Sequence, residues 1–351
     1  MKFGPVPLPL AAGKILGHNI AGPDGRRLLK KGKPLTDDNL RALAAIGRET
    51  VYVAELEPDD VAENDAARRV GTAMAGRNLR SVGPSAGRLN LLATGLGILR
   101  VDVEWLAQVN DCEGLTVATL MTNTPVQPRQ IVATIKVIPY ALPEATVHHA
   151  EMIACENDHP LISVDMLTAH AVSMIFSGSP SLREKLNADF APLRSRIEAL
   201  GSHIAHTAYI SLDDEQGETM LAEVLCNHYH AGAKLILLAG ETAIMDRSDI
   251  VPRALERAGG RVEVVGVPVD PGNLFMLGYL HGVPVLGAPG CARSKKTNVI
   301  DWVLPRLLAG DRLVRSDFIS LGHGGLLEDT RQRPMPRGKV GGTQVDKYTS
   351  K

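Results

Sequence analysis

Two carboxylates, Asp246 and Asp249, follow an unbroken apolar run at residues 235–239. That run is too short for a free-standing helix and is typical of a strand buried on both faces of a parallel sheet. It stops at Gly240, and Pro252 lies early in the next apolar-periodic stretch, as expected near a helix start. The two carboxylates would then lie at the carboxyl end of a strand, where open α/β folds bind ligands. Carboxylate oxygens suit Mg²⁺, so Asp246 and Asp249 are candidate catalytic and metal-binding residues. Alternatively, both only favour the helix start.

Two later turns follow predicted strands in the same way. The strand predicted at 261–265 leads to a turn, and the strand predicted at 283–286 leads to another. Their residues are Asp270, Pro271, Gly272 and Asn273 in the first turn and Gly287, Ala288, Pro289 and Gly290 in the second, followed by Arg293, Ser294, Lys295 and Lys296. The basic side chains could supply counter-charge to a phosphate. Taken alone, the lysine pair is more simply a solvated surface patch.

Other residues that could do chemistry have simpler explanations. Cys226 and His230 would share a helix face, but His228 points elsewhere and no fourth metal ligand is evident. The turn at residues 177–179, Ser-Gly-Ser, resembles a phosphate-binding turn, and a helix cap explains it equally well. The 4 cysteines lie far apart without a C-x-x-C pair, so neither a disulfide framework nor a structural zinc site is indicated.

The elements around these turns alternate between strand and helix from residue 169 onward. Strands are predicted at 171–176, 203–210, 235–239, 261–265 and 283–286, with helical periodicity between them. This rhythm predicts an α/β domain of three layers with a mostly parallel sheet at 169–327. Helical spacing continues from Leu182 to Leu200 through Pro192, which predicts a kink or break just before the proline.

The pattern of the first half predicts a smaller, β-rich α+β domain at residues 1–145. This domain is divisible into modules at 1–80 and 85–145. Thr36 can cap a helix whose first turn holds Asp37 and Asp38, and Gly47 stands where a left-handed C-cap would fall. Residues 146–168 have weak periodicity and are predicted to be a linker. Residues 328–351 are polar and lack apolar periodicity, which predicts a disordered tail.

Composition narrows the class of protein. The 351 residues carry a net charge of −1 and only 4% aromatic residues, which argues against a nucleic-acid partner. The prolines at the amino terminus oppose a signal peptide, and no apolar run approaches the roughly 18 residues of a membrane helix. A cytoplasmic protein that binds no membrane is therefore expected.

The strand-end turns resemble those of the molybdenum-cofactor biosynthesis domain shared by molybdopterin adenylyltransferases and molybdenum insertases. The glycine-rich loop of that family corresponds to Gly240, Glu241, Thr242 and Ala243, followed by its acidic segment and a proline, here Pro252. A Pro-Gly segment matches at Pro271 and Gly272, the Pro-Gly of the insertase loop at Pro289 and Gly290, and an Asp-Asp pair at Asp213 and Asp214. The resemblance covers residues 169–310, and the first half is similar to the extra domain of bacterial molybdopterin-binding proteins.

The resemblance implies a molybdopterin-binding α/β domain that acts in cofactor biosynthesis, maturation or delivery. Glycine-loop amides would hold the pterin phosphate, and Arg293, Lys295 and Lys296 would supply counter-charge. A transferase with Mg²⁺ at Asp246 or Asp249 is one alternative, and a non-catalytic scaffold is another. The family's second glycine is Glu241 here, which brings a carboxylate near the phosphate path and favours a carrier. A molybdoenzyme or another cofactor-synthesis protein is the expected partner, and a homo-oligomer the expected assembly.

Overall fold

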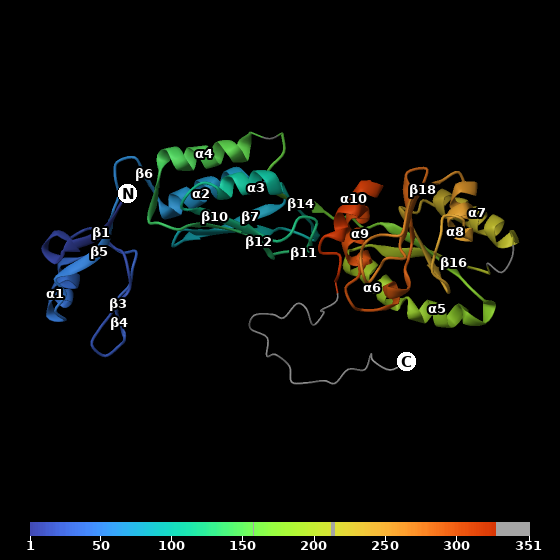
Figure 1. The fold of residues 1–351 in the computed structure, drawn as a ribbon, viewed down its shortest axis with the longest axis horizontal. Coiled ribbons are helices and arrows are strands. Elements are labelled where there is room, and N and C mark those ends of the chain that lie inside the picture. The colour runs from blue at the N-terminus through green and yellow to red at the C-terminus, as the bar shows by residue number, and fades with distance from the viewer. Residues whose placement is uncertain (157, 212–214, 328–351) are drawn as a thin grey trace. The chain divides into compact units, whose positions relative to one another are not determined.

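The structure, a computed structural model, describes residues 1–156, 158–211 and 215–327. The chain forms two compact units, Met1–Thr168 and Ala169–Lys351, and both mix helices with sheets (Figure 1). The predicted tail at 328–351 and the Asp213-Asp214 pair lie outside the described residues. No helix within the described ranges combines the length and the apolar character needed to cross a membrane.

Unit 1 begins with a small module whose core holds Leu16, Leu43 and Val53. Strand β5 lies between β1 and β2 in an antiparallel sheet. Thr36 accepts a hydrogen bond from the Asn39 amide at 3.3 Å and caps α1, and Gly47 has a φ of 74°, so both predictions for this helix are confirmed. The elements are β1 (Lys2–Pro7), β2 (Ile15–Leu16), β3 (Ile20–Ala21), β4 (Arg27–Leu29), α1 (Asp37–Ala45) and β5 (Thr50–Glu55).

The rest of unit 1 contains a four-stranded sheet in the order β10-β12-β8-β7, a three-stranded sheet in the order β11-β9-β14 and the strand pair β13-β6. Helix α2 packs on the four-stranded sheet and α4 packs on α2 (Figure 1). The elements are β6 (Asp60–Ala62), α2 (Glu63–Met74), β7 (Leu79–Ser85), β8 (Arg88–Ala93), β9 (Gly97–Val101), α3 (Val103–Asn110), β10 (Leu115–Thr119), β11 (Pro125–Val126), β12 (Ile131–Val137), β13 (Ala141–Pro143), α4 (Glu144–Cys155) and β14 (Ile162–Met166).

Two sequence predictions for this half are wrong. The predicted linker holds α4, whose Val147, Ala150 and Ile153 are buried in the core of unit 1, and β14, which pairs with β9. Small alanines on the buried face of α4 weaken the periodic signal. The predicted module boundary near residue 80 is also wrong. Strand β7 belongs to the four-stranded sheet, and helix α2 packs on that sheet. The first core cluster therefore ends at Val53, and the second begins at Ala66.

Unit 2 is built on one six-stranded sheet in the order β16-β15-β17-β20-β19-β18. Strands β16, β15, β17 and β20 are mutually parallel, and only β19 runs against the other five. The elements are β15 (Ala171–Ser177), α5 (Arg183–Asp189), α6 (Ala191–Ala199), β16 (His203–Ile210), α7 (Glu215–His230), β17 (Leu235–Gly240), α8 (Ile250–Arg257), β18 (Arg261–Val265), β19 (Met276–Leu280), β20 (Val283–Gly287), α9 (Val299–Leu308) and α10 (Arg315–Ile319).

Burial on both faces explains the continuous apolar run of β17. Leu235 through Ala239 are all buried, and Ile236 and Leu238 pack with α7 and α8 residues in one core cluster. A mixed α/β arrangement of this kind is what the alternating pattern predicts, while the three-layer arrangement stays a prediction. The helical stretch at 182–200 breaks at Phe190, with Pro192 in the first turn of α6, as predicted.

Candidate functional site

The turns identified in the sequence gather at the carboxyl edge of the unit 2 sheet. Strands β15, β17 and β20 are adjacent and parallel, and they end at Ser177, Gly240 and Gly287. The loop after β20 reaches back to the loop after β17, because Arg293 Nη2 donates to the Gly240 carbonyl at 2.7 Å and to the Glu241 carbonyl at 3.2 Å. The arrangement of strands therefore brings the two predicted loops into direct contact.

Arg293 acts here as a clamp between loops. Its Nη2 is engaged by main-chain oxygens, and its guanidinium lies 4.9 Å from the centre of the Phe190 ring. Counter-charge for a ligand phosphate was the role expected of Arg293. The structure shows a loop-holding contact for Arg293, and its role toward a phosphate stays a prediction.

Glu241 is turned toward the loop after β15. Its Oε2 accepts hydrogen bonds from the Ser179 amide at 2.9 Å and the Ser179 hydroxyl at 3.0 Å, while its own amide donates to the Ser177 carbonyl at 2.8 Å. Gly178 is packed against it, since a Cβ at that position would lie 2.9 Å from the Glu241 Cβ. The carboxylate thus takes the two donors of the Ser-Gly-Ser turn that a phosphate would need.

Asp246 and Asp249 serve their own turn. Asp249 Oδ2 accepts from the amides of Met245 at 2.6 Å and Asp246 at 3.1 Å, and Asp246 Oδ1 accepts from the Ser248 amide at 2.7 Å. The Ser248 amide, with the Ser248 hydroxyl next, holds the pKa of Asp246 below its ordinary value. Within the described ranges no three or more acidic, histidine or cysteine side chains form a metal-binding group. The carboxylates make turn-forming contacts, and a Mg²⁺ site at Asp246 and Asp249 stays a prediction.

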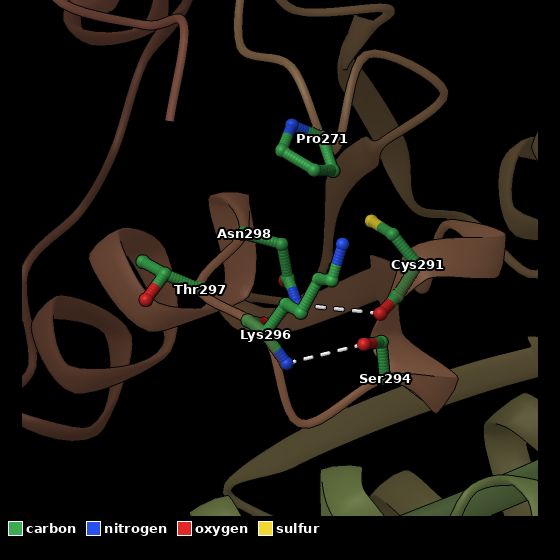
Figure 2. A pocket seen from close by; sticks show the side chains of 6 residues that line it. All are labelled: Pro271, Cys291, Ser294, Lys296, Thr297 and Asn298. Atoms are coloured by element: carbon green, nitrogen blue, oxygen red, sulfur yellow. Dashed lines mark hydrogen bonds between the residues drawn. The ribbon is translucent and has the colours of Figure 1, made fainter. Parts of the chain in front are cut away.

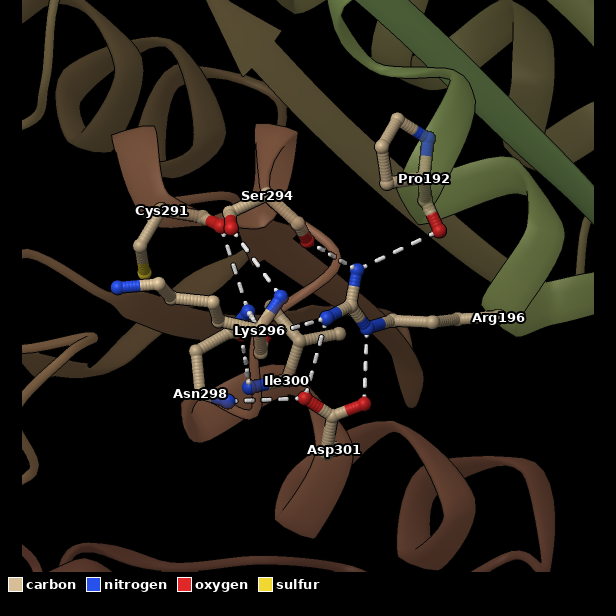
Figure 3. Close-up of polar contacts among 8 residues, drawn as sticks. All are labelled: Pro192, Arg196, Cys291, Ser294, Lys296, Asn298, Ile300 and Asp301. Carbon is tan, nitrogen blue, oxygen red and sulfur yellow. Dashed lines mark hydrogen bonds and ion pairs between the residues drawn. The ribbon is translucent and has the colours of Figure 1, made fainter. Parts of the chain in front are cut away.

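A cavity of about 280 Å³ lies between the loop after β18 and the loop after β20 (Figure 2). Both close-up views place the Lys296 ammonium beside the Cys291 thiol (Figures 2 and 3). Burial raises the pKa of the Cys291 thiol above its ordinary value. The lining residues are Pro271, Cys291, Ser294, Lys296, Thr297 and Asn298.

The loop that carries Ser294 and Lys296 is held by side chains from two helices (Figure 3). Arg196 of α6 donates to the carbonyls of Ser294 and Lys296, each at 2.9 Å, and forms an ion pair with Asp301 of α9 at 2.8 Å. Asn298 is 1% exposed and donates to the Lys296 carbonyl at 3.1 Å while its Oδ1 caps α9 at the Ile300 amide. The cavity wall is therefore pre-organised.

Sequence reasoning missed Arg196, Cys291, Thr297 and Asn298. Asn298 followed three residues later by Asp301 is a capping-box signal that the sequence does contain. Arg196 carries no such local signal, because its partners lie about a hundred positions away along the chain.

Glycines of the predicted loops differ in what surrounds them. Gly272 has a φ of 136°, and a Cβ there would lie 2.6 Å from the Val299 Cβ. At Gly240 a Cβ would lie 2.9 Å from the Thr242 carbonyl oxygen, whereas at Gly290 it would meet no atom within 4 Å. Close packing of the loops explains the first two glycines without a ligand.

Of the predicted ligand-binding residues, the cavity brings together only three: Pro271, Ser294 and Lys296. Lys295 is exposed and does not line it. Asp270 instead pairs through its backbone with Gly325 and Leu327, and the Asn273 carbonyl accepts from the Val267 amide. Pro289 is buried, and Thr242 and Ala243 lie in the turn after β17.

Comparisons with known proteins add little beyond this geometry. Residues 5–55 match a family described as "Domain of unknown function (DUF8806)", and no curated protein matches the chain. The chain is similar to a solved molybdenum cofactor biosynthesis protein from Pyrococcus furiosus, with 13% identity, a TM-score of 0.24 and coverage of 89% of this chain. It is also similar to a molybdopterin biosynthesis MoeA protein from Pyrococcus horikosii, with 14% identity and a TM-score of 0.26, covering 88% of this chain and 75% of that one.

The chain covers 66% of the Pyrococcus furiosus chain, just under two thirds of its length. What unit 2 itself defines is an α/β domain with a small cavity at the carboxyl edge of its sheet, lined by residues that include Ser294 and Lys296.

Proposed function

We propose that unit 2 binds a molybdopterin-type ligand at this edge and that the protein acts in molybdenum cofactor biosynthesis, maturation or delivery. The observation that carries the proposal is the cavity between the loops after β18 and β20, which contains an ammonium at Lys296 and a hydroxyl at Ser294. These groups suit a phosphate. The resemblance of the same loops to the molybdenum-cofactor biosynthesis domain suggests that the phosphate belongs to a pterin.

The contacts of the acidic side chains favour a binding role over a transferase role. Glu241 satisfies Ser179, and Asp249 satisfies two backbone amides of its own turn. These bonds engage one oxygen of each carboxylate, Oε2 of Glu241 and Oδ2 of Asp249, and they orient both groups toward the protein's own loops. Adenylyl or molybdate transfer is the alternative, and a non-catalytic scaffold is the second one.

The test is calorimetric titration of the full chain with molybdopterin and with finished molybdenum cofactor. Lys296→Ala removes a charge-assisted contact worth about 1.5–3 kcal/mol, so the affinity should fall by roughly tenfold or more. Lys295→Ala is the matched control, because this neighbouring lysine does not line the cavity, and it should bind like the wild type. Equal losses in both variants would point to a general surface charge effect and away from this cavity.

Incubation with ATP, Mg²⁺ and molybdopterin separates carrier from enzyme. The proposal expects no pyrophosphate and no adenylated pterin, whereas turnover would establish the transferase alternative. If neither pterin binds, the non-catalytic scaffold is the alternative that remains.

A further inference from the structure

The two outer strands of the unit 2 sheet differ in how their edges are protected. A charged side chain covers part of the β18 edge, because the Arg247 guanidinium donates to the carbonyls of Val262 at 3.3 Å and Glu263 at 3.1 Å. Arg261 and Glu263 on the same strand form an ion pair. Charged side chains along an outer strand are a common device against edge-to-edge pairing.

Strand β16 has no such device along most of its length. Its eight residues include no Asp, Glu, Lys, Arg or Pro, and it is the outermost strand of the sheet formed by the described residues. A register shift leaves Ala205 as an extra residue, so the regular part of the strand is His206–Ile210. Thr207 lies within it and is exposed.

The backbone of Thr207 faces away from the sheet. The Ile210 carbonyl accepts from the Gly178 amide at 3.1 Å, on the side of β15. Because successive residues of a strand direct their amide and carbonyl groups to opposite sides, residues 206 and 208 also face β15 and Thr207 faces outward. Among the strands that the structure describes, none pairs with this side of β16, and outward groups of this kind are a template for another strand.

We propose that β16 is a docking edge for a second copy of this chain, paired antiparallel about a two-fold axis at Thr207. The strand contains no Asp, Glu, Lys or Arg, so a copy of itself brings no carboxylates, ammonium groups or guanidinium groups together. The axis places Thr207 opposite Thr207, a favourable cross-strand pair. His206 of each copy then lies opposite Ala208 of the other, and the small Ala208 leaves room for the imidazole. The proposal goes beyond ligand binding and does not depend on it.

The first test is the mass of the full chain by sedimentation at micromolar concentration, where a dimer is expected. Thr207→Lys places two ammonium groups at the axis and should weaken dimerisation at least tenfold, because like charges directly opposite each other destabilise strand pairing. Arg261→Lys on the β18 edge keeps the charge there and should leave the dimer intact. A monomeric wild type, or a dimer that Thr207→Lys leaves unchanged, overturns the proposal.

Cross-linking tests the register itself. Directly opposed residues of an antiparallel hydrogen-bonded pair have Cα atoms about 5.5 Å apart, within the range of a disulfide. In a Cys155→Ser background, which removes the exposed native thiol, Thr207→Cys should form a covalent dimer on mild oxidation. Arg261→Cys, on the opposite edge, should not. Equal cross-linking of both variants would indicate random collision and would contradict the two-fold pairing.

Discussion

At the residue scale, the guanidinium of Arg196 joins α6, α9 and the cavity loop. Its side chain is 12% exposed, and Asp301 is 32% exposed. Arg196→Met keeps the length of the side chain but removes the guanidinium donors from the Ser294 carbonyl, the Lys296 carbonyl and Asp301. The last two keep their bonds from Asn298. We expect the free energy of unfolding to fall by about 1–3 kcal/mol, measured by urea denaturation.

The control for this variant is Arg41→Met. Arg41 is also paired with an acidic residue, Asp38, but their side chains are 76% and 84% exposed. Exposed pairs contribute about 0–1 kcal/mol, so the urea midpoint should barely move. If Arg196→Met lowers the free energy of unfolding no more than Arg41→Met does, the contacts of Arg196 do not stabilise the cavity loop.

His228 gives unit 2 a pH dependence. The residue is 9% exposed, and its Nδ1 is buried without a hydrogen-bond partner among the described residues. The centres of the His228 and His206 rings are 6.0 Å apart. Burial, with a smaller contribution from His206, lowers the pKa of His228 below its ordinary 6.5. Between the lowered value and 6.5 the unfolded chain binds more protons, so stability rises with pH and is fully present above 6.5.

The measurement is the urea midpoint across pH 5 to 8 for the wild type and for His228→Gln, which does not titrate. The wild type should lose stability as pH falls below 6.5, and the variant should show a shallower slope over that window. Parallel slopes would assign the dependence to other groups.

At the element scale, the loop after β18 requires its glycine. Gly272→Ala would force a left-handed φ of 136° on alanine and a contact with Val299, so about 2–4 kcal/mol of stability should be lost. Gly290→Ala meets no atom within 4 Å and should leave the thermal midpoint within a degree or two. Any loss of ligand affinity in Gly290→Ala would therefore report contact with the ligand and not a folding defect.

Elements with strong local signals could be predicted from the sequence. Thr36, Gly47 and Pro192 mark helix ends through backbone chemistry that acts over three or four residues, and the structure has those ends. Strand β19 was missed because Met276–Leu280 is buried throughout and lies between turn residues without a helix before it. Its antiparallel insertion depends on β18 and β20, which a local pattern does not encode.

The same reasoning separates the parts of the candidate site. Strand order placed the loops after β17 and β20 together, as their position at strand ends predicts. Side-chain direction was not predictable, because Glu241 and Arg293 are oriented by partners on other loops. A carboxylate or guanidinium at a strand end therefore indicates a site without indicating which group will face the ligand.

At the scale of the whole molecule, the two units have separate cores. The clusters around Val70 and Leu91 in unit 1 and around Leu225 and Ile236 in unit 2 share no residue. We therefore expect a fragment of residues 169–327 to fold alone, with one cooperative transition and a stability of about 5–15 kcal/mol. Circular dichroism against urea measures this, and calorimetry with molybdopterin then asks whether the fragment binds like the full chain. A fragment without a cooperative transition would show that unit 1 is needed for folding. A folded fragment that no longer binds, when the full chain does, would place part of the ligand site in unit 1.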